Sequence, residues 1–379
     1  GTKPLVRRYK FSRVHRAIND RNWDEALGQL AAFDESYGST SESLFLRARA
    51  LRHSGAYDQV DVALNKAEHL GCDENRIERE RLFLQVELGQ TSPDDRMLQR
   101  LAMDPGGDAQ EVFEALVKGY FLNDELGRAT MVLDAWHKSF PNDPQPFFYG
   151  GTIAEHNKQL EDSVRWHRQA VALAPKNPDF RRRLAEVQLS LRNYRQACLH
   201  FEVALSLRED VESLWGLGLC LKYQGKLELA RESFVRGLKV APNNTLCLVA
   251  LGEMGIEAGN GEEALRWLES ASKVNLNDYD MQYDTARALL FSGQGDLAKA
   301  HFQRAAALRR ELTRIEQLQE MAKSSPDDAE LRYQIGKSVA QYGDREEAAK
   351  WLRGALKCDP NHQLARETLT SLTMTQTQN

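Results

Sequence analysis

The fold is decided by residues 214–242, which read LWGLGLCLKYQGKLELARESFVRGLKVAP. Apolar residues recur every three or four positions in two runs, 214–221 and 227–238, which is the spacing of a helix buried along one face. Gly225 interrupts the pattern and predicts a turn. Pro242, followed by two asparagines, predicts the end of the second helix. The stretch therefore predicts a helical hairpin.

The same hairpin pattern recurs along the chain. A small or apolar residue marks each first helix at intervals of 33–35 residues, until a last step of 50: Val14, Ala48, Leu82, Val117, Gly151, Ala185, Gly218, Gly252, Ala286 and Gly336. A second column marks the second helices: Ala26, Val60, Ala129, Ser163, Ala197, Ala230, Ala264, Ala298 and Ala348. Proline closes several units, at Pro141, Pro175, Pro242 and Pro360. One period held in three columns predicts stacked hairpins.

The small residues are expected where the two helices of a hairpin cross. We predict that Gly218 faces Ala230, because a larger side chain at this crossing would force the helices apart.

These columns resemble the tetratricopeptide repeat, a helix-turn-helix unit of about 34 residues with a small residue in its first helix, Ala and an aromatic in its second, and Pro near its end. Residues 214–242 fit this pattern closely, and so do residues 332–360, which contain Gly336, Gly343 and Ala348. The resemblance covers residues 7–374. It implies an all-α fold, a right-handed α-solenoid superhelix of helix-turn-helix hairpins.

The repeat register predicts the organisation of the chain. We expect nine tandem units over residues 7–312, with residues 75–109 degenerate, then a helical extension over 313–328, a tenth unit over 329–362 and a C-terminal capping helix over 363–374. In the degenerate unit, Thr91-Ser92-Pro93 stands where the alanine column should be. A shortened second helix is therefore expected there.

The extension follows from the step of 50 residues between Ala286 and Gly336. Five apolar residues continue one stripe: Leu308, Leu312, Ile315, Leu318 and Ala322. No Pro or Gly interrupts them before Pro326, which predicts one long helix to about Lys323. The alternative is a break near Arg309-Arg310 that makes two helices.

Composition excludes several classes of partner. The 50 Lys and Arg residues nearly balance 55 Asp and Glu, so we expect no nucleic-acid partner. No apolar run reaches the ~20 residues of a membrane-spanning helix, so no direct membrane insertion is expected. The five cysteines are scattered and form no CxxC pair, which predicts free, mostly buried thiols.

The first residues leave the location open. Gly1-Thr2 precedes a basic stretch at residues 3–10, and such a stretch can follow a membrane anchor. The two hypotheses are a cytoplasmic-type soluble domain and a domain tethered to a membrane through a removed N-terminal anchor.

Sequence motifs of catalysis are missing. No two histidines stand within four residues of each other, which excludes an HExxH zinc motif. Gly336-Lys337-Ser338 has the ending of a phosphate-binding loop, but Leu331 stands where that loop requires its first glycine. We therefore expect no catalytic residue, no metal site, no cofactor and no enzyme activity.

The first helices of the hairpins line the concave face in this architecture. Six of ten residues in one inner column are aromatic: Phe11, Phe45, Arg79, Glu114, Phe148, Arg182, Trp215, Val249, Tyr283 and Tyr333. Aromatic anchors beside Arg and Lys are typical of protein-binding surfaces. The candidate partner-binding residues are Phe148, Tyr149, Arg182, Trp215, Tyr223, Tyr283, Arg287, Phe291, Tyr333 and Lys337. The alternative is that the aromatic residues stiffen the packing between hairpins.

Three tryptophans also repeat, at Trp166, Trp267 and Trp351 on second helices. We expect them to pack between neighbouring hairpins, with an exposed stripe as the alternative.

The predicted function is a non-catalytic scaffold or adaptor that binds a peptide or helix of a partner protein in its concave groove. Two alternatives stay open. One is a self-associating structural assembly protein, which would be a homo-oligomer. The other is a membrane-anchored accessory subunit of a larger complex.

Overall fold

The computed structural model describes residues 3–89, 91–92, 94–104, 106–273, 277–325, 327–342 and 345–374. These residues form 21 α-helices and one short 3-10 helix, and no strand occurs among them. The expected all-α fold is therefore confirmed. The chain divides into two compact units, Gly1–Ser139 and Phe140–Asn379.

The first unit contains eight α-helices in its described residues. They are α1 (Lys3–Asn19), α2 (Trp23–Tyr37), α3 (Ser41–His53), α4 (Tyr57–His69), α5 (Glu74–Glu87), α6 (Arg96–Met103), α7 (Ala109–Leu122) and α8 (Leu126–Ser139), with the 3-10 helix η1 (Gly106–Asp108) before α7. The pairs α1–α2, α3–α4 and α7–α8 pack as hairpins.

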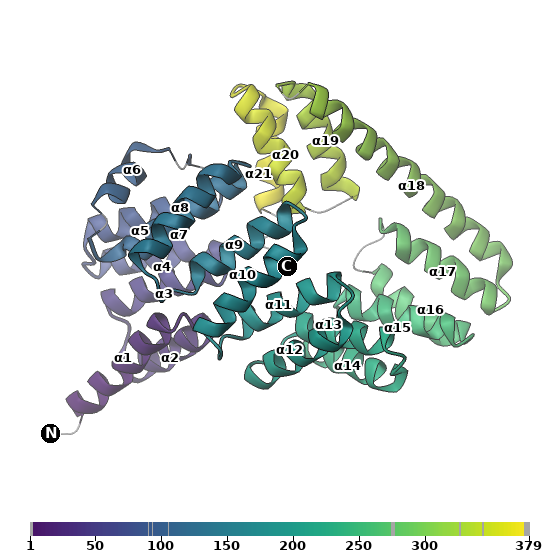
Figure 1. Cartoon of the computed structure of the whole chain (residues 1–379), viewed down its shortest axis with the longest axis horizontal. Helices are drawn as coiled ribbons and strands as arrows, with labels where there is room; N and C mark the ends of the chain where they lie inside the picture. The colour runs from purple at the N-terminus through teal and green to yellow at the C-terminus, as the bar shows by residue number, and fades with distance from the viewer. Residues whose placement is uncertain are drawn as a thin grey trace. The chain divides into compact units, whose positions relative to one another are not determined.

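The second unit continues the pattern. Its described helices are α9 (Gln145–His156), α10 (Leu160–Leu173), α11 (Pro178–Ser190), α12 (Tyr194–Leu207), α13 (Val211–Tyr223), α14 (Leu227–Val240), α15 (Thr245–Glu257), α16 (Gly261–Ser272), α17 (Tyr279–Phe291), α18 (Gly295–Ser324), α19 (Ala329–Tyr342), α20 (Arg345–Cys358) and α21 (Gln363–Met374). Consecutive helices from α9 to α20 pack in pairs, and α21 packs against α20 (Figure 1).

Local sequence sets the ends of these helices. The side chains of Asp210, Asn244 and Asp278 accept hydrogen bonds from backbone N–H groups in the first turns of α13, α15 and α17. At the hairpin turns Gly225 and Gly259 have φ values of 75° and 72°, a left-handed conformation that favours glycine. Caps and turns therefore recur with the same period as the apolar columns.

The glycines of the first-helix column let a bulky side chain of the partner helix approach closely. These contacts are His167 at Gly151, Phe234 at Gly218, Leu268 at Gly252 and Leu352 at Gly336. A Cβ on Gly252 would lie 2.7 Å from Leu268 Cγ. The ring of Phe234, one helical turn beyond Ala230 on α14, lies against Gly218, and the predicted contact of Gly218 with Ala230 stays a prediction.

The third hairpin is irregular, as predicted. Its second helix, α6, has only 8 residues and packs against α7, while α5 also packs directly against α7. Pro93, on which part of this expectation depended, lies outside the described residues, as do Pro326 and Gly343.

The predicted long helix is confirmed, because α18 runs without a break through Arg309-Arg310 for 30 residues. Its first half pairs with α17. Its second half buries Ile315 and Ala322 in a core that also contains Ile335 of α19. The unit boundaries proposed from the repeat register stay predictions.

Candidate partner-binding surface

All ten candidate residues lie in the second unit, on first helices of hairpins. Within this unit α11 contacts α13, and α15 contacts α17, so first helices of consecutive hairpins are neighbours. Arg182, Trp215 and Tyr283 occupy one register position on α11, α13 and α17. Tyr223 and Phe291 occupy another position, at the C-terminal ends of α13 and α17.

Three of the aromatic candidates are exposed. The exposed fractions are 60% for Tyr223, 42% for Tyr283 and 58% for Phe291. Two of the rings rest on neighbouring rings, with Tyr223 stacked on Tyr194 at 4.8 Å and Tyr283 edge-on to Phe302 at 5.5 Å. These contacts already restrict the side-chain rotamers, so less conformational entropy would be lost on binding. α13 and α17 thus present preorganised aromatic surface.

The other aromatic candidate residues are half-buried or buried against neighbouring side chains. The Phe148 ring lies 5.2 Å from the Phe180 ring of the next hairpin. Trp215 is half-buried against a hydrophobic core cluster. Tyr149 is half-buried, and Tyr333 is only 6% exposed. Phe148, Trp215 and Tyr333 therefore make packing contacts of the kind that the sequence left open as an alternative to partner binding.

The candidate cations differ in how they are held. Arg182 Nη1 donates to Glu186 at 2.7 Å, and Arg287 Nη1 donates to Asp284 at 2.9 Å. Lys337 is exposed and lies 5.9 Å from the centre of the Tyr333 ring. The two arginines are therefore already paired within their own helices, which the sequence did not indicate.

An acidic group lies beside the exposed aromatic residues. On α15, Glu253 and Glu257 lie 2.8 Å and 3.0 Å from Lys222 Nζ. Burial and the charges of Asp278 and Glu253 raise the pKa of Asp280. These close carboxylates would be stabilised by an additional cation.

Asp284 belongs to the same acidic group. Burial raises its pKa, and the charge of Glu253 adds to this, although the hydrogen bond from Arg287 acts in the opposite direction. The Glu253 carboxylate on α15 thus raises the pKa of Asp280 and Asp284 on α17 across the helix–helix contact.

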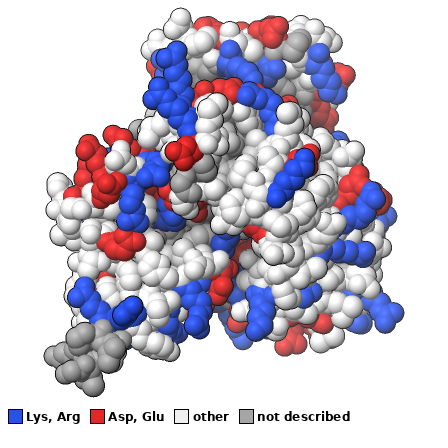
Figure 2. Space-filling view, turned by 60° about the vertical axis from the view of Figure 1, so that its left-hand side comes forward, with Lys and Arg blue, Asp and Glu red and all other residues white. Residues whose placement is uncertain are grey.

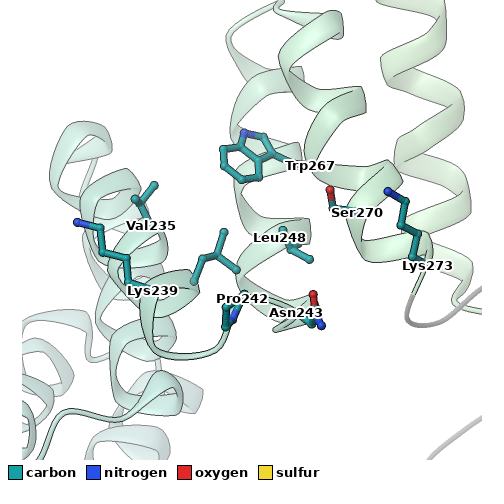
Figure 3. Close-up of a pocket in the computed structure, with 9 residues that line it drawn as sticks. Val235, Lys239, Pro242, Asn243, Leu248, Trp267, Ser270 and Lys273 are labelled. Carbon is teal, nitrogen blue, oxygen red and sulfur yellow. The ribbon is translucent and has the colours of Figure 1, made fainter.

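The repeated tryptophans have different surroundings. Trp267 is half-buried between hairpins, as predicted, and lines a surface pocket of about 630 Å³ with Val235, Leu238, Pro242 and Leu248 (Figure 3). Its Nε1 atom is buried and has no hydrogen-bond partner among the described residues, so the exposed part of the ring is carbon.

Trp166 and Trp351 each contact the first helix of their own hairpin. The ring of Trp166 lies 5.9 Å from the ring of Phe147 on α9. Arg332 on α19 stacks over Trp351 at 5.9 Å. Trp351 also packs against the core cluster that contains Ile315 and Ala322 of α18, so it joins neighbouring hairpins as predicted, whereas Trp166 is 36% exposed.

The first unit contains a buried ion network that the sequence did not predict. Arg52 on α3 is fully buried and its guanidinium donates to three carboxylates, those of Glu80, Glu87 and Glu111. Glu80 and Glu87 belong to α5 and Glu111 to α7, so one side chain joins three consecutive first helices.

The network extends to further charges. Arg49 donates to Glu80 at 3.1 Å and to Asp108 at 3.1 Å. Glu114 pairs with Lys118 at 2.9 Å and with Arg21 from the α1–α2 turn.

Burial opposes the charge of Arg52, but the carboxylates of Glu80, Glu87 and Glu111 outweigh it and hold its pKa well above the usual value. Burial likewise opposes ionisation of Glu111, but His53 and Arg52 hold its pKa well below the usual range. Arg52 and Glu111 are therefore both charged at neutral pH.

On the face shown in Figure 2, acidic and basic side chains are interspersed rather than gathered in one large patch of either sign. Across the described ranges, no group of three or more His, Cys, Asp or Glu side chains could hold a metal ion. None of the helices that the structure describes is long and apolar enough to cross a membrane.

Comparison with known proteins agrees with the observed hairpins. Family models described as tetratricopeptide repeat match residues 211–244 and 283–362. Tetratricopeptide repeat protein 7B of Homo sapiens is 28% identical over 102 residues, which are 27% of this chain and 12% of the human protein.

Two solved structures are similar over larger parts of the chain. PilW, described as a type IV pilus biogenesis factor, has 17% identity and a TM-score of 0.49, covering 53% of this chain and 94% of its own. A tetratricopeptide repeat protein of Parabacteroides merdae has 20% identity and a TM-score of 0.44, covering 71% of this chain and all of its own.

The paired helices, with their period of 33–35 residues, define a helical-hairpin repeat protein. The two family matches fall on such hairpins. Residues 211–244 and 283–362 thus match the tetratricopeptide repeat, and the 21 α-helices of the described residues fit a protein of ten such repeats. This repeat fold is consistent with protein–protein interaction, and its family generally serves as non-catalytic scaffold.

Proposed function

We propose that the protein is a non-catalytic scaffold or adaptor, and that the first-helix face of its second unit binds an extended segment or a helix of a partner protein. The observation that carries this proposal is the exposure of Tyr223, Tyr283 and Phe291, on first helices in repeat register. Large exposed aromatic side chains are common anchors of protein interfaces.

The neighbouring charges indicate what the partner carries. Four carboxylates surround this part of the face, those of Glu253, Glu257, Asp280 and Asp284, and the pKa of both aspartates is raised. A Lys or Arg of the partner placed here would relieve the repulsion between them. The partner segment therefore combines apolar side chains with at least one basic residue.

Arg182, Arg287 and Lys337 would bind hydrogen-bond acceptors of the partner in this proposal. Arg182 and Arg287 already hold intrachain carboxylates, so their remaining N–H groups would donate to acceptor groups of the partner. Phe148, Tyr149, Trp215 and Tyr333 would form the half-buried and buried wall behind the exposed anchors.

The test compares two double variants. Purified Tyr223→Ala/Phe291→Ala protein should lose most of its binding to a protein that the wild-type chain captures specifically, because two anchors are removed. The matched control is Leu227→Ala/Leu229→Ala on α14, which removes side chains that are 48% and 51% exposed on a second helix.

The control variant should bind as the wild type does. Helical content measured by circular dichroism should be the same in all three proteins. Equal loss of binding in both double variants, with folding intact, would contradict the proposed face.

A further inference from the structure

The first unit contains a cavity that the proposed function does not use. It has a volume of about 840 Å³ and lies between α1, the end of α2 and the start of α3. Its lining includes Phe11 and His15 of α1, and Phe33 and Tyr37 of α2. Aromatic side chains are therefore contributed by both helices of the first hairpin.

The rings form one continuous wall. The Phe11 ring lies 4.9 Å from the Phe33 ring and 5.1 Å from the His15 ring, and Phe33 lies 5.3 Å from Tyr37. Phe33 is only 3% exposed, whereas Phe11 and Tyr37 are half-buried. A wall of this kind accommodates a bulky apolar side chain.

The rim of the cavity is cationic. Arg7 and Arg8 both line it and both are exposed. The Arg7 guanidinium lies 5.8 Å from the centre of the Phe33 ring, and the Lys10 ammonium lies 5.4 Å from that of Tyr37. No carboxylate pairs with Arg7 or Arg8 within the ranges that the structure describes.

The charge of α1 as a whole has the same sign. Its 17 residues include six Lys or Arg and no Asp or Glu. This is unusual in a chain whose acidic residues outnumber its basic ones. The helix thus provides positive potential beside the cavity.

The acidic residue in the lining, Glu42, is already neutralised. Two N–H groups of Arg76 bind its carboxylate, at 2.7 Å and 3.1 Å. This hydrogen bonding lowers the pKa of Glu42, against the effect of burial, so the pair stays ionised and nearly neutral overall. The net charge at the rim is therefore set by Arg7 and Arg8.

We propose that this cavity is a second binding site, which takes a bulky apolar or aromatic side chain of a partner polypeptide while the Asp or Glu residues next to it bind Arg7 and Arg8. Complementary charge argues for the acidic residues, and the aromatic wall argues for the apolar side chain. A lipid surface would meet the exposed arginines but would leave the buried part of the aromatic wall, at Phe33, without a ligand, so a peptide is favoured.

The probe is a short synthetic peptide with one central Phe between runs of Asp and Glu, titrated calorimetrically into the full chain. Saturable binding is expected, and replacing the peptide's Phe with Ala should abolish it. The Arg7→Glu/Arg8→Glu variant should bind at least about tenfold more weakly than wild type.

The matched control is Arg13→Glu/Arg16→Glu, which changes the charge of α1 by the same amount at two exposed positions outside the cavity lining. Its affinity should change by less than about threefold. A further variant, Ser12→Trp, fills the cavity from its exposed rim without removing a core residue and should also block binding.

Several results would overturn the proposal. One is an equal loss of affinity in the two charge variants, which would indicate diffuse attraction to α1. Another is equal binding of the Phe and Ala peptides. A third is binding to vesicles that contain phosphatidylserine without binding to the peptide, which would identify α1 as a lipid-binding helix instead. Circular dichroism of each variant checks that its fold is intact.

Discussion

The guanidinium Nε of Arg52 on α3 lies 2.6 Å from a carboxylate oxygen of Glu80 on α5, and neither side chain is accessible to solvent. Two further carboxylates, those of Glu87 and Glu111, also bind this guanidinium. A cluster of charges like this one is costly to bury, and removal of one member leaves the other charges without their counter-charge. The irregular third hairpin is thus held by charge where α5 packs on α7 without a regular second helix between them.

Replacing Arg52 with Ala should lower the free energy of unfolding of the first unit by about 3–5 kcal/mol, because three buried carboxylates lose their common partner. Chemical denaturation followed by tryptophan fluorescence measures this. Trp23 is a suitable reporter because its ring stacks on His53 at 4.2 Å, beside the network.

The control for this substitution is Arg128→Ala in the same unit. Arg128 binds Asp94, but the two side chains are 46% and 50% exposed. Its loss should cost at most about 1 kcal/mol. Similar costs for the two variants would show that the buried network does not stabilise the unit.

The network also predicts how stability depends on pH. Burial opposes ionisation of Glu114, but Lys118 and Arg21 hold its pKa well below 4.5 in the folded chain. A carboxyl whose pKa is lower in the folded state stabilises the fold above its unfolded pKa, and this contribution is lost as pH falls toward the folded value.

Unfolding free energies measured from pH 7 to pH 3 should therefore fall steeply below about pH 4.5. The Glu114→Gln variant should be less stable at pH 7 and show a smaller decrease. Glu35→Gln, at an exposed position of α2, should keep the wild-type dependence. If the unfolding free energy of Glu114→Gln fell by as much as that of the wild type between pH 7 and pH 3, this carboxyl would not be a source of the pH dependence.

The close helix crossings predict a second effect on stability. Gly252→Ala should destabilise the second unit by about 1–3 kcal/mol, because the added Cβ would lie 2.7 Å from Leu268 Cγ. The control is Gly295→Ala at the start of α18, where an added Cβ meets nothing within 4 Å. Denaturation midpoints that move equally in both variants would argue against tight packing at the crossing.

Burial of thiols predicts their reactivity. Burial, with a smaller effect of Glu212, raises the pKa of Cys247 to about 11, and burial also raises the pKa of Cys198 and Cys220. Burial also raises the pKa of Cys72, but Cys72 and Cys358 are the two half-buried thiols, so a maleimide at pH 7 should reach and label them first. Mass spectrometry of labelled peptides measures the order, and equal labelling of all five in the native state would contradict it.

The periodic columns predicted much of the fold because each column has a local physical cause. Caps such as Asp210 and turn glycines such as Gly225 act within a few residues, and the apolar spacing of α18 requires only that one stripe be buried. Exact pairing across a hairpin could not be predicted in the same way. The pairing at Gly218 is an example, because a shift of one turn along α14 would preserve every apolar position.

The candidate site was harder to predict because exposure depends on distant segments. Tyr333 is buried in a core cluster with Leu352 and Ala365, and Ala365 belongs to α21, outside the repeat that contains Tyr333. Arg182 and Arg287 are paired with residues of their own helices. The role of each candidate residue as a partner contact stays a proposal.

The buried network left only a weak signal in the sequence. Its members extend from Arg21 to Lys118, and scattered charges of this kind are usually solvated. The column of Arg52 holds Leu189, Ile256 and Leu290 in later repeats, but it also holds Glu155 and Lys222. The register alone therefore does not mark Arg52 as a buried charge.

Site-specific photo-crosslinking tests the proposed binding face most directly. Benzoylphenylalanine placed at Tyr223 or Phe291 should form a covalent link to the partner protein in cell extract, and the same probe at Leu229 of α14 should not, although Leu229 is similarly exposed. Identification of one partner linked from both first-helix positions is the predicted result. Crosslinks that form equally from Leu229, or only from Leu229, would contradict binding of the partner at the first-helix face.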